Sequence, residues 1–397
     1  MGSSIPRRWI VLLGLVVARL AFGFQLQTVS VLAPGLMQGL ALDLIEMGTL
    51  VGLFMLPGLL LALPGGMISQ KIGERRFLIG CLLAMAFGGF LCGMAEDYST
   101  LWIGRLISGF GAIGINVAMS KIVIDWFAGK EINTAMAIFL SGFPVGIALA
   151  LVSLGHLATP DGWPLGLHSA AMFSFVALLV FLVSYRRAPV SSSQGGPAPR
   201  LNFAEVALVS VAGLIWALYN AAFMITVSFV PLYLISEGHS AVGAASLMGI
   251  GVWASIFGVP FGGIVADKIR RVNLFIISSL LFWAVSILLV IPFSHSTFSL
   301  AILLAAMTFV SSLSAGPIVA LTSEVLRAEV RSTGMGVFYM WLYGGLALGP
   351  MMGGYVSDAV RDPVAPIYLI TTLLVVAAMT LGLFRLLQSR YPHNELS

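Results

Sequence analysis

Long apolar stretches alternate with short polar ones along the whole chain. Twelve of them approach or exceed the roughly 20 residues that a helix needs to cross a bilayer. Their expected bounds are 9–34, 47–69, 77–95, 99–124, 132–157, 165–187, 205–233, 243–266, 273–293, 298–322, 333–356 and 364–388. This pattern predicts an all-α membrane protein with twelve transmembrane helices.

The longest polar interruption is 186-RRAPVSSSQGGPAPRLN-202, near the midpoint of the chain. Its proline, glycine and serine content is typical of a flexible linker. We therefore expect an N-terminal bundle of six helices over 1–187, a linker over 188–204, and a C-terminal bundle of six helices over 205–397.

Charge supports the same class of protein. Only 9% of the 397 residues are charged, whereas soluble domains carry roughly 25%. The chain therefore cannot build a surface that faces water throughout. Its net charge of +4 does not indicate nucleic-acid binding, because the basic residues fall at the ends of predicted helices.

The basic residues outside the apolar stretches also predict an orientation. With the N-terminus inside, they face the cytoplasm, and Arg361 alone falls in a predicted outer loop. Lys and Arg accumulate in cytoplasmic loops of membrane proteins. We expect a multi-pass protein of the bacterial inner membrane, with both termini and the linker in the cytoplasm.

The two halves of the chain repeat each other. The loop 65-GGMISQKIGERR-76 after the second stretch resembles 262-GGIVADKIRR-271 after the eighth, and 134-TAMAIF-139 resembles 333-TGMGVF-338. Each pair lies at corresponding positions of the two predicted bundles. The sequence therefore predicts two pseudo-symmetric six-helix units.

These motifs resemble those of the major facilitator superfamily. The two loops are similar to its signature loops, and 105-RLISGFGAIG-114 is similar to its helix 4 motif. The resemblance covers the whole chain and implies a transporter of two six-helix bundles, not an enzyme. The arginine at position 19 and the residue pattern of 126-WFAGKEINTAMAIFLSGFPVGIAL-149 further resemble those of the bacterial cyanate-transporter-type branch.

Two arginines lie deep inside predicted helices. Arg19 follows about ten apolar residues in the first stretch, where a charge costs about 2.5–3.5 kcal/mol. Arg105 lies in the fourth stretch, and no acidic residue is expected near the middle of the membrane. An anionic substrate would supply the missing charge, and the planar guanidinium fits a carboxylate.

Each arginine also has a structural alternative. For Arg19, the alternative is that its side chain reaches polar groups at a helix end. For Arg105, the alternative is a structural or coupling role. Further polar candidates for the site are Asn116, Tyr219, Asn220, Tyr339 and Tyr343. Asn116 falls on the helix face of Arg105, and ordinary hydrogen bonds between helices explain each of the five equally well.

The family resemblance implies that the repeated loops act as a gate. The usual aspartate of the first loop is replaced by Gln70, whereas Asp267 keeps it in the second. The expected gate residues are Gln70, Arg75, Arg76 and Asp125 in the N-terminal half, and Asp267, Lys268, Arg271, Glu324 and Arg331 in the C-terminal half.

The sequence gives little support for dinucleotide binding, ATP-driven transport or a metal site. The G-x-G-x-x-G pattern at 109–114 lies inside a predicted membrane helix, where small residues serve helix packing and not dinucleotide binding. No Walker loop appears, and the histidines lack the spacing of metal ligands. We expect no cofactor and no metal, and keep His168 as a candidate proton site.

The sequence therefore predicts a secondary transporter that moves a small organic or inorganic anion by alternating access, with uptake favoured. Its expected partners are the anion, with or without co-transported protons, and the bilayer, and we expect a monomer. The alternative is a proton-driven exporter of drugs or metabolites, and a non-transporting receptor is a third possibility. The identity of the anion stays open.

Overall fold

The computed structural model describes residues 7–62, 64–127, 132–186, 201–269, 271–327 and 330–390. Its regular elements in these ranges are helices. The N-terminal half contains α1 (Arg7–Val31), α2 (Ala33–Leu40), α3 (Leu44–Leu53), α4 (Gly58–Leu61), α5 (Pro64–Ile72), α6 (Glu74–Gly93), α7 (Tyr98–Phe127), α8 (Ile132–Leu154), the 3-10 helix η1 (Gly155–Leu157) and α9 (Trp163–Ser184).

The C-terminal half is built in the same way. It contains α10 (Phe203–Ser236), α11 (Ala241–Lys268), α12 (Val272–Leu289), α13 (Thr297–Ser312), α14 (Ala315–Ala320), the 3-10 helix η2 (Leu321–Glu324), α15 (Arg331–Val360) and α16 (Ala365–Gln388). In the described ranges, eleven helical stretches are long and apolar enough to cross a membrane. Each overlaps a predicted span, and α15 covers the remaining one.

The second predicted span, 47–69, is broken. It consists of α3, α4 and α5, with a turn over 54–57 between the first two. Pro57 accounts for the break, because its nitrogen cannot donate to the carbonyl of Leu53, where α3 ends. The carbonyls of the last turn of α3 are therefore left without partners inside the helix.

Two other spans differ from the prediction for a related reason. The expected helix 298–322 is split into α13 and α14, and Pro317 cannot donate to the carbonyl of Leu313 at the break. The first span continues past its expected end as α2, which carries Pro34 in its first turn. Proline tolerates that position, since its missing N–H would be unpaired there in any case.

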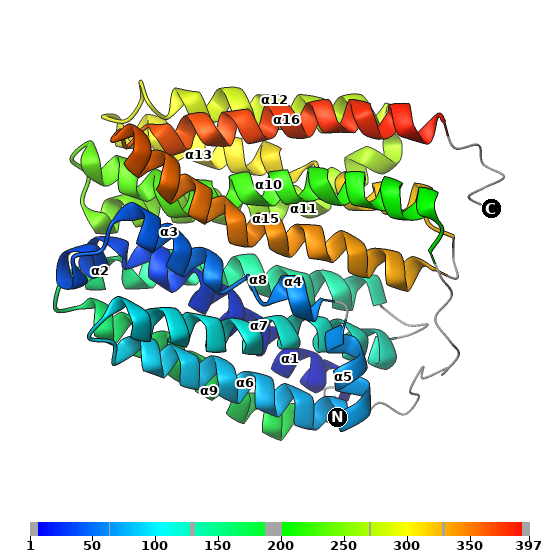
Figure 1. Cartoon of the computed structure of the whole chain (residues 1–397), viewed down its shortest axis with the longest axis horizontal. Helices are drawn as coiled ribbons and strands as arrows, with labels where there is room; N and C mark the ends of the chain where they lie inside the picture. Colours follow the sequence, from blue (N-terminus) through cyan, green and yellow to red (C-terminus); the bar gives the residue numbers. More distant parts are fainter. Residues whose placement is uncertain are drawn as a thin grey trace, which may run out of the picture.

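Corresponding helices pack in the same way in the two halves. In the N-terminal half, α1 packs against α8 and α9, and α6 against α7 and α9. In the C-terminal half, α10 packs against α15 and α16, and α12 against α13 and α16. Figure 1 shows the two halves side by side, with the helices of the C-terminal half above. The predicted internal repeat is therefore also a repeat of packing.

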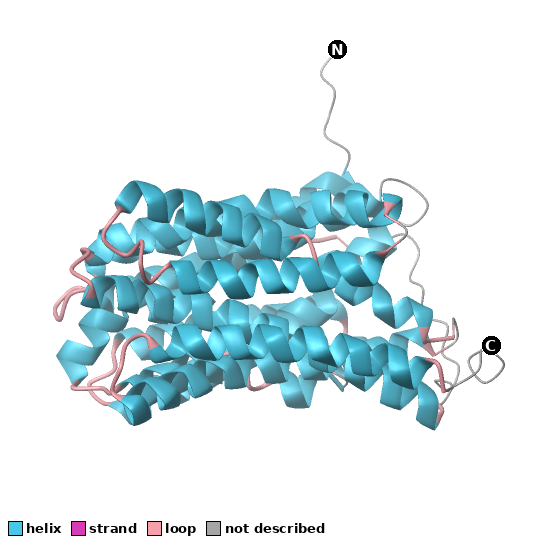
Figure 2. Cartoon of the chain, turned by 90° about the horizontal axis from the view of Figure 1, so that it is seen from above, coloured by secondary structure: helices cyan, strands magenta, loops and turns pink. Residues whose placement is uncertain are grey.

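The long helices run between two ends of the molecule (Figure 2). At one end α1 and α10 begin and α9 and α16 finish, and we call this the linker end; it lies on the right in Figure 1. We call the opposite end, where α2 lies, the far end. The halves meet chiefly through α3 with α15 and α8 with α11, pairs that the repeat also relates.

At the far end, α3 and α15 pack backbone to backbone. A Cβ atom on Gly48 would lie 2.2 Å from the carbonyl oxygen of Pro350, and one on Gly52 would lie 2.1 Å from that of Ala347. Neither distance is sterically possible. This closed arrangement of the far end therefore requires glycine at both positions.

Polar contacts between the halves support the same closure. Three hydrogen-bonded pairs lie near the far end: Ile45 N–H donates to Asp358 Oδ2 at 2.8 Å, Gln27 Nε2 donates to Val227 O at 3.0 Å, and the hydroxyls of Ser30 and Ser228 lie 2.9 Å apart. The last two join α1 to α10. The halves are thus tied along two helix pairs at this end.

We expect Gly48→Ala to open the far end, because the added methyl group cannot fit against Pro350. Ala33 is 1% exposed and lines a small cavity between the halves, so a cysteine placed there reports on opening. Its labelling by a maleimide should accelerate in Gly48→Ala. Gly80→Ala is the control, because a Cβ atom there meets nothing within 4 Å. Equal labelling rates in both variants would contradict this account of the closure.

Candidate functional site

Arg19 lies near the middle of α1, and its guanidinium takes part in a hydrogen-bonded chain between the halves. Its Nη1 donates to Asn116 Oδ1 on α7. Asn116 Nδ2 in turn donates to the hydroxyl of Tyr343 on α15, at 2.6 Å. We call these three residues the Arg19–Asn116–Tyr343 chain. It places one predicted cation at the contact between the two halves.

Aromatic rings flank this cation. The centroid of the Phe139 ring lies 4.5 Å from Arg19 Cζ and that of Phe143 lies 5.9 Å away, both on α8. Tyr339 on α15 is 40% exposed and close enough for its phenol to interact electrostatically with Arg19. Ring faces attract a guanidinium, but they do not neutralise it.

The charge of Arg19 has no acidic partner among the described residues. None of the ion pairs between those residues includes it. Its Nε is buried and lacks a hydrogen-bond acceptor. A guanidinium has five N–H donors, so this one is held by a neutral amide while most of its bonding capacity is unused.

Arg105 is held very differently. Its Nε donates to Leu50 O at 2.9 Å, Nη1 to Gln25 O at 3.0 Å and Nη2 to Leu26 O at 3.4 Å. It is 1% exposed and covers the ring of Phe54 at 4.4 Å. The Leu50 carbonyl belongs to the last turn of α3 and is free because of the helix break. Arg105 thus joins α1, α3 and α7, which favours its structural alternative.

Two other predicted site residues have partners inside the C-terminal half. Tyr219 on α10 donates its hydroxyl to Ser311 O at 3.3 Å, and its ring stacks on Trp216 with centroids 5.1 Å apart. Asn220 Nδ2 donates to Trp216 O at 2.8 Å, within the same helix. The structure therefore gathers Arg19, Asn116, Tyr339 and Tyr343, and gives Tyr219 and Asn220 local roles.

The predicted gate is described only in part. Arg75, Arg76, Lys268 and Arg271 are exposed at the linker end. The side chains of Gln70, Asp125, Asp267 and Arg331 lie outside what the structure describes. Their expected contacts therefore stay predictions.

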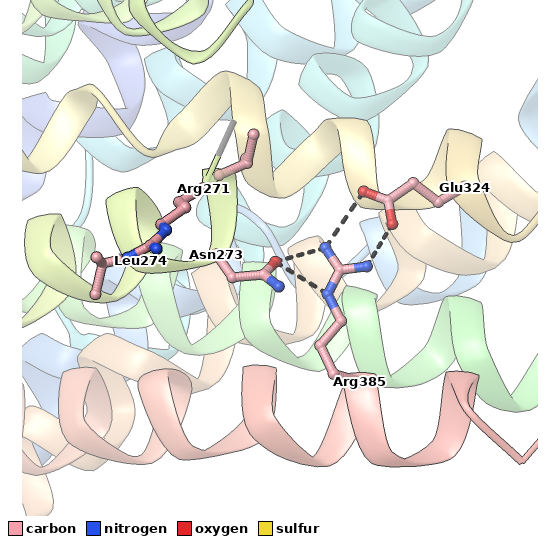
Figure 3. Close-up of a pocket in the computed structure, with 6 residues that line it drawn as sticks. Arg271, Asn273, Leu274, Glu324 and Arg385 are labelled. Atoms are coloured by element: carbon pink, nitrogen blue, oxygen red, sulfur yellow. Dashed lines mark hydrogen bonds and ion pairs between the residues drawn. The ribbon is translucent and has the colours of Figure 1, made fainter. Parts of the chain in front are cut away.

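Glu324 has a partner that the sequence did not indicate. It accepts hydrogen bonds from Arg385 of α16, whose Nε also donates to Asn273 Oδ1 at 2.9 Å. Figure 3 shows Arg385 lying between these two residues, with Arg271 farther off beside Leu274. Together they line an open cavity of about 640 Å³. The pair joins residues 61 positions apart in one half, so no local sequence pattern announces it.

A second ion pair at the linker end was also missed. Arg327 holds the carboxylate of Glu205 with two bonds, Nε to Oε1 at 2.8 Å and Nη2 to Oε2 at 3.1 Å. Glu205 is buried, and its backbone N–H is capped by Asn202 in the first turn of α10. The available sequence signal was Asn-x-x-Glu before an apolar run, which is a capping pattern.

The candidate proton site is separate from Arg19. His168 lies on α9 of the N-terminal half, and its ring stands 5.1 Å from that of Phe90. Its Nδ1 is buried without an acceptor or donor partner. None of its described contacts joins it to the Arg19–Asn116–Tyr343 chain.

Comparison with known proteins identifies the family. The Major Facilitator Superfamily model matches residues 12–277 and 238–396. The chain belongs to the major facilitator superfamily. Its fold class and the resemblance inferred from its loops are thereby confirmed, and it is a transporter-family protein and not an enzyme. The finer resemblance to the cyanate-transporter-type branch stays a prediction.

Several relatives are transporters of organic acids by name. The 3-(3-hydroxy-phenyl)propionate transporter of Escherichia coli is 27% identical over 369 residues, which are 89% of this chain and 88% of that protein. The hexuronate transporter of Bacillus subtilis is 20% identical over 254 residues, or 61% of this chain and 60% of that one.

A solved structure has the same fold. It is a bacterial homologue of the human lysosomal transporter Spinster, in an inward-facing and occupied conformation. The TM-score is 0.77 at 19% identity, and the match covers 100% of this chain and 99% of that chain. The likeness concerns the arrangement of the helices.

The two arginines should respond differently to the same substitution. Arg105→Gln removes a buried group that bonds three carbonyls, and should cost about 3 kcal/mol of stability or more. Arg19→Gln should cost much less, because it also removes a poorly satisfied charge. The midpoint of thermal unfolding in detergent measures both. An unchanged midpoint in Arg105→Gln would contradict its structural role.

Proposed function

We propose that this protein is a secondary transporter that moves a small organic anion across the bacterial inner membrane by alternating access, with uptake as the direction. The observation that carries this proposal is the state of Arg19. It lies at the contact between the halves and has no acidic partner among the described residues, and its Nε lacks an acceptor. A bound carboxylate would supply the missing negative charge.

The charge of the substrate follows from the two arginines. Arg105 donates to three carbonyls, so among the side chains that the structure describes Arg19 is the cation that remains available in this region. One cation matches one negative charge, because a second carboxylate placed there would be desolvated without a partner. We therefore propose a monocarboxylate and not a dicarboxylate.

The body of the substrate follows from the flanking rings. Phe139 and Phe143 offer apolar surface beside the guanidinium, and Tyr339 and Tyr343 add hydroxyls from the other half. An aromatic acid with a polar substituent fits this combination. The name of the relative that matches over 89% of this chain contains such an acid, hydroxyphenylpropionate, which supports the proposal.

The remaining parts of the proposal concern movement. The two bundles, 1–187 and 205–397, rock about the Arg19 region, with the linker 188–204 and both termini in the cytoplasm. Gln70, Arg75, Arg76, Asp125, Asp267, Lys268, Arg271, Glu324 and Arg331 form the cytoplasmic gate. The protein works as a monomer, and co-transport of protons is open.

Titration of the purified protein with 3-phenylpropionate tests the site. Arg19→Gln should weaken binding by about tenfold to a hundredfold, because hydrogen bonds to charged groups contribute roughly 1.5–3 kcal/mol. Arg19→Lys should lie between, since it keeps the charge and loses the planar fork. The matched control is Arg7→Gln, which removes an exposed arginine from the same helix.

Two ligands complete the experiment. The neutral amide 3-phenylpropanamide and the dianion phenylsuccinate have the same aromatic body as the probe, and both should bind wild type more weakly than the monoanion. Equal affinity of wild type and Arg19→Gln for 3-phenylpropionate would overturn the anion site. A preference for phenylsuccinate would overturn only the single charge.

A further inference from the structure

The bond between Arg19 and Asn116 has an unusual acceptor. An amide oxygen occupies the position on Nη1 where a carboxylate oxygen would bind an arginine. The amide is neutral and contributes one oxygen, whereas a carboxylate is charged and contributes two. Bonds between ionised groups are roughly twice as strong as neutral ones. An anion that reaches Arg19 should therefore replace Asn116.

The geometry of the guanidinium makes this replacement necessary. A carboxylate pairs with arginine either along the Nε and Nη2 side or across the Nη1 and Nη2 end. Nε is buried, so the first side is closed to an incoming anion. The second side is open only if Nη1 is released, and Asn116 Oδ1 holds Nη1.

Asn116 also connects Arg19 to the opposite half. Its Nδ2 donates to the Tyr343 hydroxyl at 2.6 Å. Tyr343 packs so closely on Gly58 that a Cβ atom there would lie 2.2 Å from its ring. The helix of Tyr343, α15, is the one that closes the far end against α3. A change at Asn116 therefore affects a contact between the halves.

We propose that Asn116 is an internal substitute for the carboxylate of the substrate, which holds Arg19 and Tyr343 together while the site is empty. This inference rests on the proposed function. When the anion binds Arg19, Asn116 gives up Nη1, and Tyr343, whose hydroxyl oxygen accepts from Asn116 in the empty state, donates its own hydroxyl hydrogen to the second carboxylate oxygen. Binding thus replaces a bond between the halves within the protein by one that runs through the substrate.

The choice of asparagine fits this role. An aspartate at 116 would form a lasting ion pair with Arg19, and an alanine would leave the guanidinium with no acceptor in the empty state. Asparagine has an acceptor for Arg19 and a donor for Tyr343 on one short side chain. It holds both partners and still yields to a charged competitor.

Substitutions at 116 test the inference with opposite signs. In titrations with 3-phenylpropionate, Asn116→Ala should tighten binding severalfold, because no internal ligand has to leave. Asn116→Asp should weaken it by about tenfold or more, because the anion must displace a charged group. Asn116→Asp should also raise the thermal midpoint of the empty protein. Ser120→Ala is the control, one turn along α7.

The outcomes separate this inference from the proposed function. Weaker binding in Asn116→Ala would make Asn116 a direct ligand of the substrate and overturn the inference, as would wild-type affinity in Asn116→Asp. Neither result would touch the anion site, provided that Arg19→Gln loses affinity. Unchanged affinity in Arg19→Gln would overturn the proposed function itself.

Discussion

A guanidinium inside an apolar bundle has to find acceptors, and the structure depends on how two arginines do so. Arg105 takes three carbonyl oxygens and is fully buried. One of these carbonyls, that of Leu50, is available because α3 ends at Leu53 and the N–H of Phe54 bonds Gly52 O in its place. The break in the second span and the charge in the fourth are thus parts of one solution, since each satisfies the unpaired groups of the other.

Arg19 shows the opposite solution. Its position between α1, α7, α8 and α15 gives it aromatic faces and one amide oxygen in place of backbone carbonyls. Both arginines lie in apolar surroundings, and burial alone does not decide their roles, although Arg105 is buried and Arg19 only partly buried. The completeness of their hydrogen bonding does. A satisfied arginine holds helices together, and an incompletely satisfied one has binding capacity left for a ligand.

Much of the helical architecture could be predicted from hydropathy, since membrane spans need long apolar runs. The break at 54–57 was also readable, because Pro57 stands in the second run. The partners of the charged side chains could not be predicted from the sequence. Glu324 meets Arg385 and Glu205 meets Arg327 through contacts 61 and 122 residues apart, which depend on how whole helices are placed.

The kind of candidate site could be proposed from the sequence, but not which residues belong to it. A buried arginine without a nearby acid indicates an anion, and that reasoning needs only the sequence. That reasoning alone does not distinguish Arg19 from Arg105, because the carbonyls that satisfy Arg105 carry no side-chain signature. Tyr219 likewise looked available, whereas its hydroxyl reaches Ser311 O on a neighbouring helix.

In the proposed mechanism, the placement of Asn116 links binding to movement. Closure of the far end depends on glycines that let α3 and α15 pack backbone to backbone. Tyr343 lies on α15 nearer the linker end than that contact. Its hydroxyl accepts a hydrogen bond from Asn116, which in turn accepts one from Arg19. A ligand shifts an equilibrium between two arrangements only by its difference in affinity for them. A substrate that replaces Asn116 at Arg19 acquires such a difference, because it takes over a bond that exists only while Tyr343 is near. Binding of an anion at Arg19 then shifts the equilibrium between the arrangements of the two bundles.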